Sequence, residues 1–99
     1  MTRTLIVEPE AEVEIAEAAS WYEARSPGRG LEFLRAVEGS LEVVQRNPYE
    51  YQATYRDVRR APVKRFPYGL MYVATEQEIV VVACIHGRRN PSRWKGRVP

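Results

Sequence analysis

Residues 79–86 read IVVVACIH and follow a second apolar run, RAPVKRFPYGLMYVA, at residues 60–74. Both runs are rich in β-branched and aromatic residues, and only Thr75 to Glu78 separate them, which predicts a β-hairpin. The run at 79–86 is the more apolar, so we expect the central strand of a sheet, buried on both faces. Basic residues follow it and would place cations at one edge of the sheet, where they suit an anionic partner: Arg88, Arg89, Arg93, Lys95 and Arg97.

Two amphipathic helices are predicted upstream of these strands. After a short strand at residues 4–7, Pro9 stands in the first turn of a helix, where its missing N–H costs no hydrogen bond. The second helix should begin with Ser26 as its cap and Pro27 at its first position, and should end at Asn47 and Pro48. Apolar residues recur at helical spacing in both: Ala11, Ile15, Ala18 and Tyr22, then Leu34, Val37, Leu41 and Val44.

The remaining residues complete an α+β fold in the order β-α-α-β-β-β. We expect a loop at 49–58, a strand at 59–65, a turn at 66–69, strands at 70–74 and 79–86, and a short C-terminal helical turn that contains Trp94. The small sheet should be largely antiparallel, with the two-helix hairpin packed on one face and a more polar opposite face. Residues 1–99 should form a single domain, because a chain this short supports one core.

Charge and cysteine content narrow the class of protein. Residues 1–50 contain five Arg and ten Glu, a net charge of −5, whereas residues 51–99 contain ten Lys or Arg and three acidic residues, a net charge of +7. Cys84 is the single cysteine and is expected to be a small buried hydrophobic residue.

No apolar stretch could span a bilayer and no signal peptide is evident, so we expect a cytoplasmic protein without membrane contact. We expect no metal site and no cofactor, because neither a ligand cluster nor a phosphate-binding glycine loop occurs.

Several segments resemble the RelE/ParE superfamily of bacterial toxins, over nearly the whole chain. They are AASWYE at 18–23, Phe33-Leu34, Asn47-Pro48, RFPYGLMY at 65–72 and HGRRNPSRW at 86–94. The resemblance is closer to the ParE-like, plasmid-stabilisation branch. It implies the toxin of a type II toxin–antitoxin system, which a small cognate antitoxin wraps and silences.

Members of the ParE-like branch inhibit DNA gyrase and are not nucleases. The resemblance therefore favours a gyrase inhibitor that blocks replication and is not an enzyme. In ParE-like proteins the segment after the last strand is implicated in toxicity, and that role carries over to Arg88, Arg89, Arg93 and Trp94. The tip of the helix hairpin, at residues 25–29, is a second candidate contact surface.

An endoribonuclease is the alternative, because RelE-like members cut messenger RNA on the ribosome. Such a reaction needs an acid, a base and cations around the phosphate. The candidates for this chemistry are His86, Arg65, Lys64 and Arg88. The set is incomplete: no tyrosine follows Tyr72, and the indole of Trp94 exchanges no proton at neutral pH.

The resemblance also implies contact with an antitoxin, either as an added strand or as a helix across the helix hairpin. The residues assigned to that contact are Arg59, Arg60, Arg65, Tyr68 and Tyr72. Packing is the alternative role for Tyr68, Tyr72, His86 and Trp94. A third possibility for the whole protein is a weakly toxic or non-toxic module that binds its antitoxin and nothing else.

Overall fold

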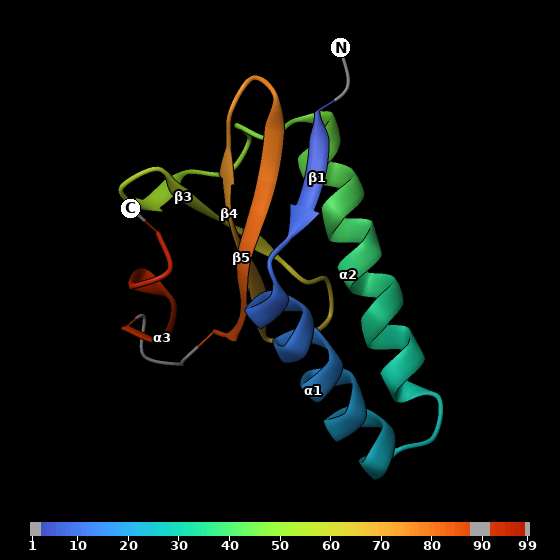
Figure 1. The fold of residues 1–99 in the computed structure, drawn as a ribbon. Coiled ribbons are helices and arrows are strands. Elements are labelled where there is room, and N and C mark those ends of the chain that lie inside the picture. The colour runs from blue at the N-terminus through green and yellow to red at the C-terminus, as the bar shows by residue number, and fades with distance from the viewer. Residues whose placement is uncertain (1–2, 88–91, 99) are drawn as a thin grey trace.

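The computed structural model describes residues 3–87 and 92–98 and confirms the α+β class. Its elements follow one another in the order β1 (Thr4–Val7), α1 (Pro9–Arg25), α2 (Arg29–Arg46), β2 (Ala53–Tyr55), β3 (Val58–Pro62), β4 (Tyr68–Ala74), β5 (Glu78–His86) and α3 (Ser92–Lys95). Figure 1 shows α1 and α2 as an antiparallel hairpin beside the sheet, with α3 on the other side. Among the described helices, none has the length and apolar content needed to cross a membrane.

The sheet has the strand order β1-β5-β4-β3-β2. β1 runs parallel to β5, and every other neighbouring pair is antiparallel, as the largely antiparallel prediction requires. β5 lies between β1 and β4, and most of its residues are buried. Its Val and Ile residues therefore have no solvent-facing side, which is why they form one continuous apolar run.

The strand boundaries differ from the predicted ones at three places. The predicted loop at 49–58 contains a short strand, β2, and a tight turn in which Arg56 has a φ of 51°. The predicted strand at 59–65 ends at Pro62, because the chain turns back there and the Val63 amide donates to the Tyr68 carbonyl, 2.9 Å away. Tyr68 and Gly69, predicted as part of a turn, pair with β5 instead.

The helix hairpin forms as predicted, but its turn is built differently. α2 begins at Arg29, and its N-cap is Gly28 with a φ of 91°, a left-handed conformation that favours glycine. Ser26 is therefore not the cap. The carboxylate of Glu23 takes over this role by accepting hydrogen bonds from the amides of Gly28 and Gly30, both at 3.0 Å. A Cβ at position 30 would lie 2.7 Å from the Ala19 carbonyl oxygen, so only glycine allows the two helices to approach this closely.

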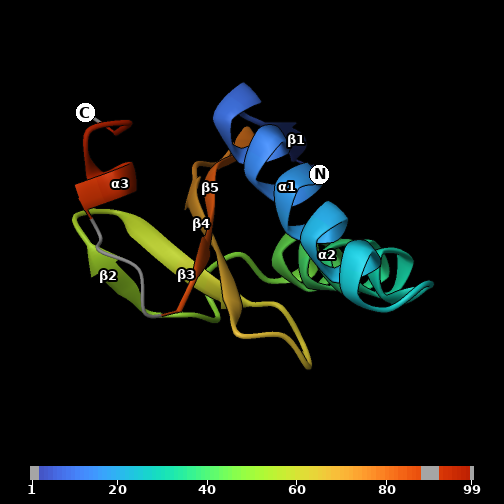
Figure 2. The ribbon, with the colours of Figure 1, turned by 90° about the horizontal axis from the view of Figure 1, so that it is seen from below.

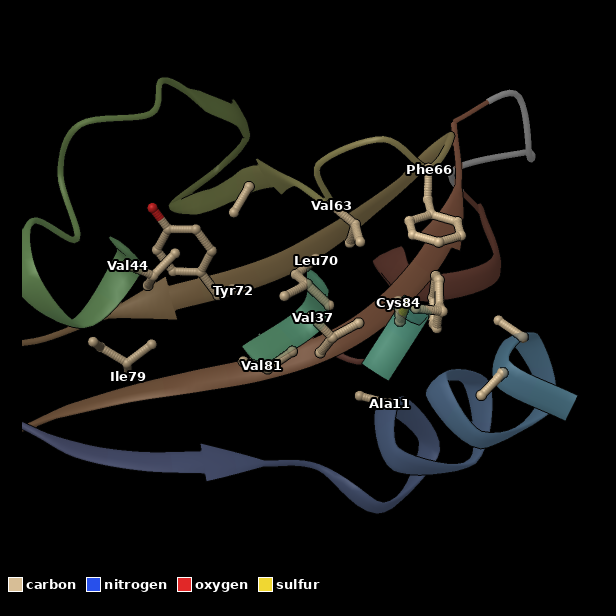
Figure 3. Packing of buried hydrophobic residues seen from close by; sticks show 14 residues of the cluster. Ala11, Val37, Val44, Val63, Phe66, Leu70, Tyr72, Ile79, Val81 and Cys84 are labelled. Atoms are coloured by element: carbon tan, nitrogen blue, oxygen red, sulfur yellow. The ribbon is translucent and has the colours of Figure 1, made fainter. Parts of the chain in front are cut away.

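The main core lies between the helix hairpin and the sheet (Figure 3). Phe33, Leu70, Tyr72 and Ile79 are its largest fully buried side chains in the described part of the chain. At one end, Tyr22, Phe33, Phe66 and Tyr68 form a ring cluster with centroid separations of 4.9 to 6.3 Å. Such edge-to-face and offset contacts add specific packing energy to the apolar burial.

The face of the sheet away from α1 and α2 is not the polar face that the sequence predicts. Figure 2 shows α3 on this side, with the sheet between it and the two long helices. A second apolar cluster fills the space and comprises Val58, Met71, Val82, Ala83, Ile85 and Trp94. The physical reason is the composition of β5, whose outward-facing residues are also apolar and need cover.

Tyr72 provides a test of how the loop after α2 is held. Its ring is fully buried and its hydroxyl donates to the Pro48 carbonyl oxygen at 2.7 Å. Tyr72→Phe removes this donor and leaves a buried carbonyl unpaired, so we expect the free energy of unfolding in urea to fall by about 1–2 kcal/mol. The matched control is Tyr49→Phe, because the Tyr49 side chain is 49% exposed and its loss of a hydroxyl should change little. Equal effects of the two variants would contradict the assignment.

Candidate functional site

His86 lies at the end of β5, where strand pairing places it opposite Tyr68. Their rings meet edge to face with centroids 5.3 Å apart. His86 also lines a cavity of about 500 Å³ together with Trp21, Tyr68, Arg93 and the carboxylates Glu14 and Glu17. The half-buried His86 ring is thus both a packing partner of β4 and part of a charged cavity wall.

Lys64 and Arg65, the other described candidates for ribonuclease chemistry, lie in the turn between β3 and β4. Both are exposed, and Arg65 adopts a φ of 75°. Phe66 follows them and enters the core, where the Arg29 guanidinium lies 4.4 Å from its ring centroid. The turn is therefore anchored by Phe66. Arg88, the fourth candidate, lies outside the described residues.

The residues predicted to contact an antitoxin do not form one surface. Consecutive residues of a strand point to opposite faces, so Arg59 lies on the helix side and Arg60 on the other. Arg59 donates to the Tyr51 carbonyl and covers the Tyr49 ring, which ties the loop after α2 to the sheet.

The two tyrosines of that set, Tyr68 and Tyr72, also pack against the rest of the fold. Tyr72 is fully buried, which raises its pKa and agrees with the alternative packing role; its contact with an antitoxin stays a prediction. Tyr68 is half-buried in the ring cluster.

The residues predicted to contact a target are partly buried as well. Trp94 is only 5% exposed, packs in the second apolar cluster, and meets the Tyr55 ring edge to face at 5.7 Å. It therefore pins the C-terminal segment, residues 92–98, to the sheet. Arg93, its neighbour, is exposed. Arg88 and Arg89 lie outside the described residues.

A partly buried ion pair that the sequence does not reveal holds the other end of this segment. The Arg97 guanidinium donates to both carboxylate oxygens of Glu14, at 2.9 and 3.0 Å, and to the Val82 carbonyl at 3.0 Å. Glu14 also accepts the Cys84 amide at 3.0 Å. The hydrogen bond that Arg97 donates to Glu14 raises the pKa of Arg97. Eighty-three positions separate the partners, and no local pattern marks such a pair.

This pair occupies a free strand edge. β1 ends at Val7, opposite Val81, so the following residues of β5 have no parallel neighbour. Their orphan amide and carbonyl groups need partners. Glu14 at the Cys84 amide and Arg97 at the Val82 carbonyl supply them, and the edge is closed to other strands at this point.

An apolar groove lies on the helix side of β1. It has a volume of about 540 Å³ and is lined by Val7, Glu12, Ile15, Ala16, Ala19, Ser20 and Leu34. Leu34 is 37% exposed and Leu31, on the same helix, is 52% exposed. Ile15 and Leu34 belong to the apolar helical patterns that the sequence shows, but the groove itself depends on how β1 and the two helices meet.

Comparison with known proteins identifies the relatives of this fold. Residues 5–91 match the family model of the ParE toxin of the type II toxin–antitoxin system parDE. A solved chain described as the chromosomal ParDE TA system from P. aeruginosa superposes with a TM-score of 0.75 at 13% identity, over 86% of this chain and 96% of that chain. At this identity the structural likeness concerns the fold alone. No curated protein sequence matches the chain.

Within the described residues, no group of His, Cys, Asp and Glu could hold a metal ion.

Cys84 offers a test of the packing beneath the site. Burial, reinforced by the nearby Glu14 carboxylate, raises the pKa of its thiol to about 12. The reactive thiolate is therefore scarce at neutral pH, and the sulfur is covered. We expect iodoacetamide at about pH 8 to label the unfolded chain readily and the folded protein at least a hundredfold more slowly. Mass spectrometry over a time course measures both rates. Equal labelling of the folded and unfolded protein would contradict the buried position.

Proposed function

This chain belongs to the ParE toxin family of type II toxin–antitoxin systems, and from that premise we propose that it inhibits DNA gyrase and is neutralised by a cognate antitoxin. The observation that carries the proposal is the family match, which runs from the second residue of β1 through both long helices and the other described strands. The geometry is compatible with inhibition by binding. A binding inhibitor needs a firmly held, charged contact surface and no proton-transfer pair.

The contact surface for gyrase in this proposal is the C-terminal segment together with Arg88 and Arg89. Trp94 and Arg97 anchor the segment at two points, through the second apolar cluster and through Glu14. Between the end of β5 and these anchors, Arg93 is exposed. An exposed cation beside two fixed anchors is well placed for charge-complementary contact with another macromolecule.

The cognate antitoxin in this proposal covers the apolar groove beside β1. The matched solved chain comes from a ParDE toxin–antitoxin system, which supports an antitoxin as the occupant. An amphipathic helix that lays its apolar face into a groove is a recurrent mode of peptide recognition. Ile15, Ala16 and Ala19 leave room for such a face, and the exposed Leu34 would be buried by it.

The gyrase target is tested by titrating the purified protein into a supercoiling reaction with relaxed plasmid and scoring cut DNA. We expect inhibition with accumulating double-strand breaks. Arg93→Ala should raise the concentration needed by about tenfold, because one charge-complementary contact is lost. Arg35→Ala, an exposed arginine on α2, is the matched control and should behave as the parent protein.

Two other outcomes would overturn the gyrase target. Ribosome-dependent cleavage of messenger RNA without any effect on gyrase would indicate the nuclease alternative. Binding of the antitoxin with no effect on gyrase, ribosomes or growth would indicate a module that only binds its antitoxin.

The groove is tested by calorimetric titration with the antitoxin encoded beside this protein. Leu34→Glu places a charge where an apolar face should pack, and we expect the dissociation constant to rise by roughly 10- to 100-fold. Leu34→Met keeps the apolar surface and should bind as the parent protein does. Full affinity of the Leu34→Glu variant would exclude the groove as the antitoxin site.

A further inference from the structure

A second cleft lies on the sheet face opposite α1 and α2, between β3, the end of β5 and the C-terminal segment. Its volume is about 210 Å³, and its walls include Tyr55, Arg60, Met71, Ile85, Trp94 and Lys95. Most of these side chains are apolar. The volume accommodates one side chain of a partner, not a folded element.

The Arg60 guanidinium is built into the floor of this cleft. It lies against Gly69 of β4, where a Cβ would come within 2.4 Å of the Arg60 Nε and 2.6 Å of its Cζ. At Gly87 a Cβ would lie 3.4 Å from an Arg60 terminal nitrogen. Only the absence of a side chain at position 69 therefore lets the guanidinium adopt this place, and the two glycines bracket it.

In the part of the chain that the structure describes, Arg60 has no hydrogen-bond acceptor. It is half-buried, yet it makes no hydrogen bond or ion pair with any described residue. Arg29, Arg59 and Arg97, by contrast, each donate to a carboxylate or carbonyl oxygen. Partial burial weakens the hydration of a guanidinium, and its five N–H donors need acceptors. The unmet donors therefore favour an external acceptor.

The charges of the residues around Arg60 favour an anionic ligand in this cleft. Lys95 is a second cation in the cleft, with its ammonium 4.6 Å from the centroid of the Tyr55 ring. None of the described lining residues is Asp or Glu. Two cations with no internal counter-charge in a mostly apolar cleft create a positive potential that a single anionic group can neutralise.

We propose that this cleft binds the side-chain carboxylate of an acidic segment in a protein partner. The planar guanidinium pairs with both oxygens of a carboxylate, while the walls of Met71, Ile85 and Trp94 cover its methylene groups. A nucleic-acid backbone is a poorer occupant, because it needs a long polar groove with cations along successive phosphates. The site is separate from the apolar groove beside β1 and does not depend on gyrase as the target.

The test uses isotope-labelled full-length protein and the blocked peptide acetyl-Ala-Leu-Glu-Leu-Ala-amide at low ionic strength. We expect saturable NMR shifts at the amides of Gly69 and Gly87 and at the Arg60 Nε–H, with a dissociation constant on the order of 1 mM. The same peptide with Gln in place of Glu should not saturate. Arg60→Gln should abolish the saturable shifts, and Arg60→Lys, which lacks the planar fork, should weaken binding about tenfold.

Further variants separate the site from a general charge effect. Lys95→Gln should weaken binding with the fold intact, as monitored by the unperturbed amide spectrum elsewhere. Arg35→Gln makes the same charge change on an exposed part of α2 and should bind normally. Equal binding of the Glu and Gln peptides would overturn the proposal, as would normal binding by folded Arg60→Gln. Tighter binding of a thymidine hexanucleotide at the same amides would replace the carboxylate with a phosphate ligand.

Discussion

The burial of β5 on both faces is the constraint on which the rest of the structure depends. Its apolar residues alternate between the two sides of the sheet, so neither side can face water without loss of hydrophobic stabilisation. The helix hairpin covers one side through Phe33, Val37 and Val44. The C-terminal segment covers the other side through Trp94, with Val98 packed nearby. The C-terminal segment is therefore part of the hydrophobic packing of this small protein.

Glu14 and Arg97 provide hydrogen-bond partners for the part of β5 that extends beyond β1. The strand is longer than its parallel neighbour β1, and the chain leaves the sheet at Val7 to form α1. A partly buried pair of this kind costs desolvation, and it gains little by itself. Here the same atoms also satisfy the Cys84 amide and the Val82 carbonyl, so the pair replaces part of a missing strand. The pair links α1, β5 and the C-terminal segment. The position of Arg93 in that segment therefore depends on the packing of the core.

Five of the described arginines of the second half divide into three structural groups. Arg59 and Arg97 hold loops and strand edges through main-chain acceptors. Arg93 and Arg65 are exposed. Arg60 is held against β4 with no described partner, in a place that the glycine at position 69 makes possible. Net positive charge alone does not distinguish these roles, because all of them contribute equally to the formal count.

The sequence by itself determined the two helices, the β4–β5 hairpin, the buried central strand and the toxin family, because periodicity and short motifs record local structure. It failed at the start of α2, where Glu23 caps the helix from the preceding one, and at the second sheet face, which is covered by an apolar cluster and is not polar. Only the tertiary structure decided the parallel β1–β5 pairing, the cover of the second sheet face, the Glu14–Arg97 pair and the cleft around Arg60. Each joins residues far apart in the chain, and such contacts are selected by burial and hydrogen-bond satisfaction across the whole fold, which no local pattern encodes.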